Sequence, residues 1–286
     1  MILKTSSLTP QLLHIIKDQG TEQPFTGEYD DLDTPGTYLC RQCGLALYRA
    51  QTKFHSGCGW PSFDNEIAGA VERRPDADGR RTEILCIRCH AHLGHVFTGE
   101  GFTAKNTRHC VNSLSLDFID NLETTNSEEA IFAAGCFWGV EHYLKKLPGV
   151  VKTEVGYSGG HKLSPAYEDV CQGNSGHLEV IRVLYDPGKL SYEQLLKYFF
   201  EIHDFTQTDG QGPDLGQQYL SAVFYYDEGQ QKTAQKIIKL LQDKNYAVVT
   251  QLKPVTTFWP AEKYHQEYYS KTGKQPYCHH YTKRFD

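Results

Sequence analysis

The chain has 286 residues, of which 39% are hydrophobic and 22% charged, and its formal net charge at pH 7 is −6. This charge disfavours nucleic acid as the main partner, because binding phosphate groups requires a basic face. No apolar run is long enough to cross a bilayer, and the first residues lack the pattern of a secretory leader. We therefore expect a cytoplasmic protein with no membrane partner, and the length suits two domains.

Residues 1–119 predict a mainly β domain. A short helix opens it, with Thr9 as its cap and Gly20 just beyond its end. Short alternating runs such as TYLC (37–40) and TEILC (82–86), separated by turns with Gly and Pro, are typical of small hairpins. We interpret RPDADGRR, which clusters three arginines, as a solvated hairpin or loop.

Residues 120–129, DNLETTNSEE, are polar and aperiodic, as expected of a linker. Residues 130–286 predict an α+β domain, a two-layer arrangement of helices on a sheet. Amphipathic helices are predicted at 139–147, 192–203 and 229–244, and strands at 130–135, 178–185 and 220–226. The predicted fold is therefore two domains of different class.

The nine cysteines are many for a cytoplasmic protein, and their odd number excludes complete pairing in disulfides. Metal binding and redox chemistry are the leading explanations. The motifs CRQC and CIRC each present two thiols from one tight turn, which indicates a structural zinc site. Its predicted ligands are Cys40, Cys43, Cys86 and Cys89. A redox pair of thioredoxin type is the alternative, but neither motif clearly opens a helix. No organic cofactor is indicated.

Five motifs follow one another in the first half: CxxC, SGCGWPSF, CxxC, AHLGHVF and R-x-C-x-N-S. In this order they closely resemble the methionine sulfoxide reductase B family, over roughly residues 5–118. The resemblance implies that Cys110 is the nucleophile and that Cys58 is the resolving thiol. The resemblance also implies that Arg108 favours the thiolate of Cys110 and that Asn112 orients nearby groups. It implies that His95, supported by His92, acts on the sulfoxide oxygen and that Trp60 contacts the methyl group of the substrate.

A structural role for His92 is an equally open alternative to a functional one. His109 stands where a tyrosine is common in the family.

GCFWGVE, in the second half, places a cysteine between a strand and a helix. The unpaired N–H groups at the start of that helix favour the thiolate of Cys136. Phe137 and Trp138 offer aromatic faces that suit a methyl group and a sulfur atom. A buried structural cysteine is the alternative, but a thiolate beside an apolar cage is what the reduction of a methyl sulfoxide requires.

The same segment is similar to the active-site signature of methionine sulfoxide reductase A. The likeness continues through GYSGG, YEDVCQGNSGHLEV, DLGQQYLSAVFY and FWPAEKYHQEYY, over about residues 130–280. It implies that Glu179 is the general acid, with a pKa raised by burial. It also implies that Tyr167 and Tyr219 hydrogen-bond the sulfoxide oxygen, and that Asp214 is an acidic pocket residue.

Cys278 matches the resolving thiol, and we expect a mobile C-terminal segment to bring it to the site. A surface thiol without function is the alternative for this residue. Leu220 stands where the family often has Arg. We expect this difference to affect substrate binding rather than the chemistry of reduction. Cys171 matches a position with no catalytic duty, and we interpret it as buried packing.

Together the resemblances imply a bifunctional peptide-methionine sulfoxide reductase. Oxidised methionine sulfur is chiral, so one pocket accepts one epimer: the A type takes the S epimer and the B type the R epimer. Each site would pass through a sulfenic acid and a disulfide that thioredoxin reduces. The role would be repair of oxidised proteins under oxidative stress, and Met1 is the only methionine of the chain itself.

Two other functions compete with this interpretation. A thiol peroxidase or dithiol–disulfide oxidoreductase would explain the thiols but not the aromatic cages. A zinc-stapled interaction module would make all cysteines structural.

We predict that Cys136→Ser abolishes reduction of the S epimer only and that Cys110→Ser abolishes reduction of the R epimer only, because each nucleophile serves one pocket. Assays of both variants with each pure epimer of methionine sulfoxide would check this. Loss of both activities from either single substitution would contradict the assignment of one nucleophile to each domain.

Overall fold

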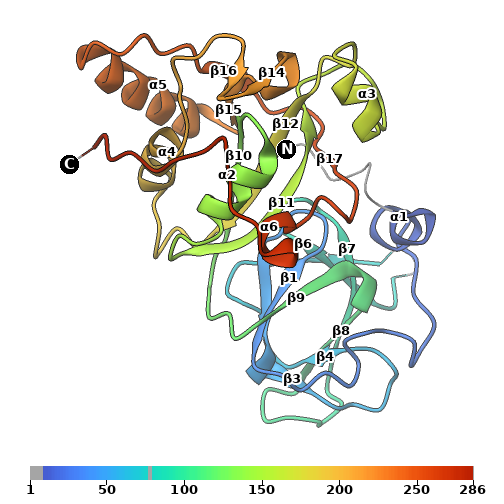
Figure 1. Ribbon diagram of the computed structural model, residues 1–286. Coiled ribbons are helices and arrows are strands. Elements are labelled where there is room, and N and C mark those ends of the chain that lie inside the picture. The colour runs from blue at the N-terminus through green and yellow to red at the C-terminus, as the bar shows by residue number, and fades with distance from the viewer. Residues whose placement is uncertain (1–8, 77–78, 286) are drawn as a thin grey trace. The chain divides into compact units, whose positions relative to one another are not determined.

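The computed structural model describes residues 9–76 and 79–285 (Figure 1). The first eight residues, which include Met1, and residues 77 and 78 of the predicted arginine-rich loop lie outside the described residues. The chain divides into two compact units between Ser127 and Glu128.

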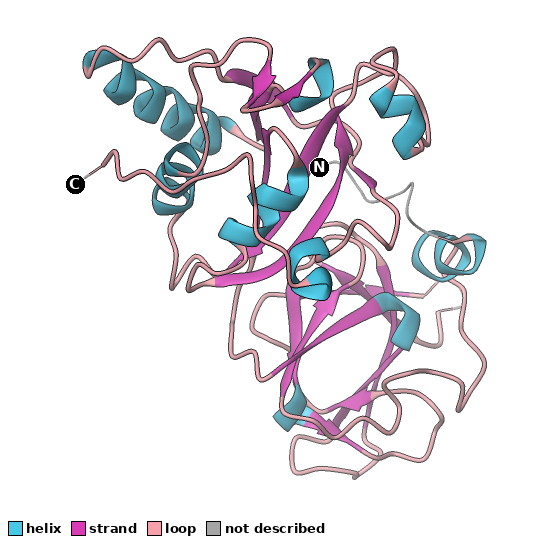
Figure 2. Ribbon diagram, viewed as in Figure 1, coloured by secondary structure: helices cyan, strands magenta, loops and turns pink. Residues whose placement is uncertain are grey.

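The first unit is mainly β, as the sequence predicts (Figure 2). Its strands are β1 (Gly36–Cys40), β2 (Ala46–Arg49), β3 (Lys53–Phe54), β4 (Ser62–Phe63), β5 (Val71–Pro75), β6 (Thr82–Cys86), β7 (His92–Thr98), β8 (Thr107–Val111) and β9 (Leu116–Asp120). They form a three-stranded sheet in the order β2-β1-β9 and a six-stranded sheet in the order β3-β4-β8-β7-β6-β5. Neighbouring strands are antiparallel, which is the arrangement that hairpins produce.

Helix α1 (Pro10–Lys17) opens this unit, and the Thr9 side chain accepts a hydrogen bond from the Leu12 N–H at 3.2 Å. The core beneath the sheets is aromatic: the Phe63 ring lies 4.9 Å from that of Tyr38 and stacks on that of Tyr48 at 4.3 Å. Large rings let a small domain bury much apolar area with few residues.

The second unit combines helices with one large sheet. Its helices are α2 (Phe137–Leu144), α3 (Tyr167–Cys171), α4 (Tyr192–Glu201), α5 (Glu228–Asp243) and α6 (Tyr268–Thr272). Its strands are β10 (Glu128–Ala134), β11 (Val150–Ser158), β12 (Leu178–Tyr185), β13 (Gly210–Gln211), β14 (Asp214–Leu215), β15 (Ser221–Tyr225), β16 (Gln251–Pro254) and β17 (Trp259–Pro260). The six-stranded sheet has the order β16-β15-β10-β12-β11-β17, and only β15 and β16 pair in parallel.

Alternation along β10 explains the two layers. Phe132 and its alternate neighbours pack with α2, α4 and α5 in one cluster, whereas Ile131 and Ala133 pack on the other face against loop residues such as Phe258. Because the side-chain period of a strand is two, one strand supplies both faces of the sheet. The predicted two-layer α+β domain is confirmed.

Two element boundaries differ from the sequence prediction. Helix α2 starts at Phe137, two residues earlier than the predicted 139, so Cys136 occupies its N-cap position. Strands β9 and β10 extend into the predicted linker from both sides, which leaves 121–127 between them. Among the described residues, no helix has the length and apolarity needed to cross a membrane.

Candidate functional site

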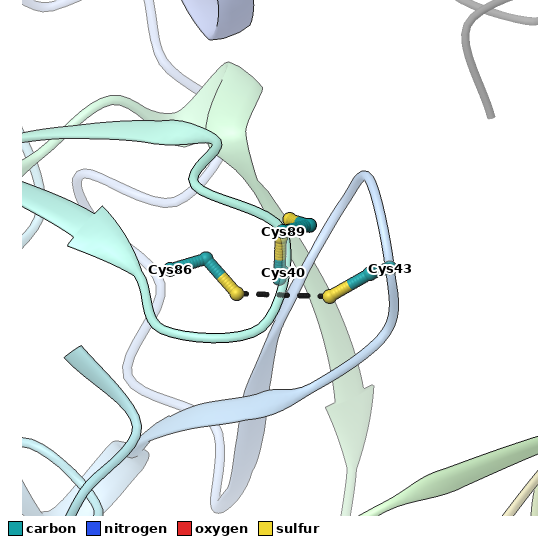
Figure 3. Close-up of side chains that lie close together, drawn as sticks. All are labelled: Cys40, Cys43, Cys86 and Cys89. Atoms are coloured by element: carbon teal, nitrogen blue, oxygen red, sulfur yellow. Dashed lines mark hydrogen bonds between the residues drawn. The ribbon is translucent and has the colours of Figure 1, made fainter. Parts of the chain in front are cut away.

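Four cysteine sulfurs converge in the first unit and form what we call the four-cysteine cluster (Figure 3). The Sγ atoms of Cys40 and Cys89 lie 3.5 Å apart, those of Cys43 and Cys86 lie 3.6 Å apart, and all four lie within 4.8 Å of one another. All four residues are buried. With Zn–S bonds of about 2.3 Å, the edges of a tetrahedral site measure about 3.8 Å, so the cluster fits zinc in size and donor type.

The two CxxC turns are built alike. Cys40 ends β1 and Cys86 ends β6, and each turn closes with a backbone bond, from the Gly44 N–H to the Cys40 carbonyl (2.7 Å) and from the His90 N–H to the Cys86 carbonyl (2.8 Å). Gly44 and His90 both have positive φ, as the tight turn requires. Because β1 and β6 belong to different sheets, the cluster joins the two sheets of this unit.

Cys58 and Cys110 form a second group, with Sγ atoms 3.8 Å apart. Cys110 lies in β8, where its cross-strand neighbours are Ser62 on β4 and His95 on β7. A disulfide requires about 2.05 Å between the sulfurs, so a small movement of the Cys58 loop is sufficient to form one.

Neighbouring side chains donate hydrogen bonds to Cys58. Its Sγ accepts bonds from the Ser56 hydroxyl at 3.0 Å and from the Arg108 guanidinium at 3.5 Å. The bond from the Cys110 thiol, with smaller contributions from the Ser56 and Ser62 hydroxyls, lowers the pKa of Cys58 to about 4. The same bond and burial raise the pKa of Cys110.

Arg108 lies beside both sulfurs: the Cys58 bond and burial raise the pKa of Cys110, whereas the charge of Arg108 and a hydrogen bond from it lower that pKa, in the direction the sequence prediction expects. The guanidinium donates two bonds to the Glu100 carboxylate, at 2.7 and 2.9 Å, and its carbon lies 4.5 Å from the centre of the Phe97 ring. Held in this way, it also donates a hydrogen bond to Cys58.

A cavity of about 120 Å³ lies beside Cys110, and Trp60, His95 and Asn112 line it. The Trp60 indole donates to the Glu22 carbonyl at 3.1 Å, and the Asn112 side-chain oxygen accepts from the Glu22 N–H at 3.0 Å. Cys110, Trp60, His95 and Asn112 of the sequence prediction therefore come together here, whereas Cys58, His92 and Arg108 lie outside the lining of the cavity.

Glu22 is a residue that the sequence prediction missed. It is 5% exposed, and its carboxylate accepts the N–H groups of Ser113 and Leu114 at 2.6 and 3.0 Å. Its segment thus fixes both Trp60 and the residues that follow Cys110. Nothing in the stretch TEQPF marks this role, because the partners are about 90 residues away along the chain.

The two histidines of AHLGHVF have acidic partners that the sequence prediction also missed. His92 is 1% exposed, with Nδ1 at 2.6 Å from a Glu83 carboxylate oxygen, and burial lowers its pKa. His95 has Nε2 at 3.1 Å from the Asp76 carboxylate and its ring faces that of His92. Of the two, only His95 lines the cavity, so the structure favours the structural alternative for His92.

In the second unit, Cys136 caps the N-terminus of α2 and is 7% exposed. A hydrogen bond from the Cys278 thiol lowers its pKa most, and backbone N–H groups of Trp138 and Gly139 add to this effect. The start of the helix therefore acts on the thiolate in the way the sequence indicates.

Glu179 points to the same helix start from the neighbouring strand β12. Its carboxylate accepts the Phe137 N–H at 3.0 Å, and the side chain is 2% exposed. Burial, and then the nearby negative charge of Cys136, raise its pKa well above the usual range. Burial thus favours the protonated form of this carboxyl group.

Two aromatic side chains flank Cys136. Phe137 is buried against Tyr157, whereas Trp138 is partly exposed and stacks on Tyr268 at 3.8 Å. The Trp138 indole N–H donates to Nδ1 of His265 at 3.1 Å. His265 and Tyr268 were missed as site residues, although both belong to the quoted FWPAEKYHQEYY segment.

The other predicted pocket residues surround Glu179. Burial raises the pKa of both Tyr167 and Tyr219, and the charge of Glu179 contributes, so both hydroxyls remain proton donors. Asp214 on β14 accepts the Tyr277 hydroxyl at 3.0 Å through Oδ1, and its Oδ2 is buried without a hydrogen-bond partner among the described residues. Leu220 packs against the apolar cluster around Phe258.

Cys278 is 4% exposed, and its Sγ, the Cys136 Sγ and an Asp214 carboxylate oxygen all lie within 4.8 Å of one another. The expectation of a mobile terminus is corrected, because Gln211 donates to the Cys278 carbonyl at 3.0 Å and the residue is part of the domain. Burial also excludes the surface-thiol alternative.

Cys171 corrects a second expectation, since it is exposed rather than buried. Helix α3 has five residues, and Val170 lies on its buried face. The next residue therefore points about 100° away, toward solvent.

Two thiol pairs and the four-cysteine cluster define a thiol-dependent oxidoreductase with two sites. The family description "Peptide methionine sulfoxide reductase" matches residues 128–286, and the description "SelR domain" matches residues 8–120. The chain belongs to the peptide methionine sulfoxide reductase family, with a SelR domain fused in front.

Similar proteins support this assignment for the second half. The chain is 47% identical to peptide methionine sulfoxide reductase MsrA of Nautilia profundicola over 150 residues, which are 52% of this chain and 87% of that protein. It is 46% identical to the MsrA of Thermus thermophilus over 152 residues, 53% of this chain and 86% of that protein. The crystal structure of reduced Mxr1 from Saccharomyces cerevisiae superposes with a TM-score of 0.52 and 33% identity, covering 55% of this chain and 92% of Mxr1.

The chain is accordingly a bifunctional methionine sulfoxide reductase. Its second domain is of the type that reduces the S epimer, and its SelR domain is of the type that reduces the R epimer.

We predict that Glu179→Gln lowers turnover of the S epimer by about 10²- to 10⁴-fold, because an amide donates no proton. In the unsubstituted chain, S-epimer turnover should fall as pH rises through the raised pKa of Glu179, since only the neutral carboxyl donates. Rate–pH profiles with the S epimer check both points. Glu141→Gln is the matched control, because Glu141 is equally buried in the same domain but hydrogen-bonds Thr153. An alkaline limb that persists in Glu179→Gln would contradict the assignment.

Proposed function

We propose that each domain reduces its epimer with its own pair of cysteines, Cys136 with Cys278 and Cys110 with Cys58. The observation that carries this proposal is that one chain holds two separate sulfur pairs in near contact, at 3.8 Å in the first domain and within 4.8 Å in the second. A sulfenic acid formed on one sulfur is then within reach of the other.

In the second domain, Cys136 attacks the sulfoxide sulfur while Glu179 protonates the oxygen. The thiolate is favoured by the start of α2, and the protonated carboxyl is favoured by burial. Trp138 contacts the methyl group from a ring fixed by Tyr268, and the hydroxyls of Tyr167 and Tyr219 hold the oxygen. Methionine leaves, and Cys136 keeps the oxygen as a sulfenic acid.

In the first domain, Cys110 is the nucleophile because it, and not Cys58, lines the cavity with Trp60 and Asn112. The Cys58 thiolate supplies the base: it takes the Cys110 proton across their 3.8 Å contact as Cys110 attacks. His95 then hydrogen-bonds the sulfoxide oxygen. Cys58 afterwards attacks the sulfenic acid and forms the disulfide.

The reductant that we propose is thioredoxin, which reopens both disulfides by thiol–disulfide exchange. Peptide-bound methionine sulfoxide is the proposed substrate, in the repair of oxidised proteins under oxidative stress. Nine cysteines, all free among the described residues, suit a reducing compartment such as the cytoplasm.

Zinc at the four-cysteine cluster is proposed as a structural ion. Four sulfurs leave no open coordination position, so the ion would take no part in the reaction. It would bind the end of β1 to the end of β6 and thereby hold the two sheets of the first domain together.

We predict that one turnover of each epimer without reductant leaves two disulfides, Cys58–Cys110 and Cys136–Cys278, because each resolving sulfur already faces its nucleophile. Peptide mapping by mass spectrometry would identify them, and adding reduced thioredoxin should restore all free thiols. Cys171→Ser is the matched control, since its thiol is exposed and belongs to neither pair. Disulfides between other partners would refute the resolving roles.

We predict one zinc ion per chain, and that Cys86→Ser removes it and lowers the unfolding temperature of the first domain, because sheet-to-sheet contact is lost. Metal analysis and thermal unfolding measure this, and Cys171→Ser again serves as the control. A metal-free chain with an unchanged unfolding temperature would contradict the structural role.

A further inference from the structure

His279 follows Cys278 and is fully buried. Its Nδ1 lies 3.1 Å from the Cys278 Sγ, and its Nε2 lies 2.5 Å from the Ala134 carbonyl oxygen. A carbonyl oxygen only accepts, so Nε2 carries the hydrogen and Nδ1 presents its lone pair to the thiol. Burial lowers the pKa of His279 to about 4, which keeps the ring neutral at neutral pH.

The domain holds this ring in a fixed position. A Cβ atom at position 139 would lie 2.2 Å from Nδ1 of His279, so the glycine of the first turn of α2 makes room for the imidazole. The Tyr143 hydroxyl donates to the His279 carbonyl at 3.3 Å, and Gln211 anchors the Cys278 carbonyl. The ring thus lies between the end of β10 and the start of α2.

We propose that His279 is the general base of the resolving step, and that its Nδ1 takes the proton of Cys278 while the sulfur attacks the sulfenic acid of Cys136. This proposal rests on the proposed roles of the two cysteines. It adds a catalytic residue, since His279 contacts a reacting sulfur.

The step balances without a further reagent. The Cys278–Cys136 S–S bond forms and the S–O bond of Cys136 breaks, so Cys278 is oxidised and Cys136 is reduced. The thiol proton goes to Nδ1, the hydroxyl leaves as water with a proton from solvent, and the imidazolium returns its proton to solvent.

The resting hydrogen bond explains why a base is needed. In the reduced site the Cys136 thiolate accepts a hydrogen bond from the Cys278 thiol. This bond and burial raise the pKa of Cys278. Once Cys136 carries oxygen, that thiolate is gone and the thiol must give its proton to another acceptor.

Asp214 is the rival acceptor. A carboxylate oxygen lies within 4.8 Å of the Cys278 sulfur; Oδ1 accepts the Tyr277 hydroxyl, whereas Oδ2 is buried without a hydrogen-bond partner among the described residues. Nδ1 of His279 lies 3.1 Å from the sulfur and aims an unshared lone pair at it. The titratable groups that face His279 are Cys278 and His280 beside it, Tyr143 on α2, His203 after α4, and Asp214 on β14.

The test separates the two chemical steps. The reduced chain is mixed with the S epimer of free methionine sulfoxide without reductant, and released methionine and the Cys136–Cys278 disulfide are measured over time. In His279→Asn, methionine release should stay within about twofold, while the disulfide forms at least about tenfold more slowly. Dimedone should then trap the sulfenic acid on Cys136. His280→Ala, the exposed neighbour, is the matched control and should leave both rates unchanged.

A pH series distinguishes a base from a packing residue. Without a base, the disulfide rate should rise about tenfold per pH unit, because solvent must supply the thiolate. The unsubstituted chain should show a flatter profile.

Three results for His279→Asn would overturn the proposal. The disulfide could form as fast as in the unsubstituted chain, or methionine release and disulfide formation could slow equally. Disulfide formation could also slow without rising about tenfold per pH unit. Slowing in Asp214→Asn but not in His279→Asn would also overturn it and assign the base to Asp214. Failure of the underlying function is distinct, because the unsubstituted chain would then release no methionine.

Discussion

The structure depends on one recurring contact, two cysteine sulfurs close enough to share a single proton. In each domain the contact between the two sulfurs lowers the pKa of one thiol and raises that of the other. A shared proton keeps a nucleophile available without exposing an unpaired charge in a buried site. The same closeness lets the second sulfur capture a sulfenic acid before it is oxidised further.

The two domains reach this contact with different structural elements. The second domain uses a helix N-terminus, where backbone N–H groups stabilise Cys136 and hold Glu179 beside it. The first domain places Cys110 in a strand of a sheet and gives Cys58 side-chain donors, the Ser56 hydroxyl and the Arg108 guanidinium. The pairs therefore differ in which member has the lowered pKa: Cys58 in the first domain and Cys136 in the second.

Much of the chemistry could be predicted from short stretches of sequence. The strand-to-helix change at Cys136, the two CxxC turns and the alternation of the strands are local patterns, and local geometry decides them. For this reason the two-domain fold, the four clustered sulfurs and the aromatic neighbours of Cys136 were predicted correctly. Predictions failed where local context misleads: Cys171 in a short helix is exposed, and the C-terminal segment is packed rather than mobile.

By itself, then, the sequence determined which residues carry sulfur chemistry and which class of domain holds them, since these depend on residue type and spacing within one element. Only the tertiary structure decided which atoms meet. Glu22 reaches Asn112 across about 90 residues, Arg108 turns to Cys58 because Glu100 holds it, and His279 meets Ala134 from the far end of the domain. Such contacts depend on how distant strands and loops pack, and no pattern within one segment encodes them.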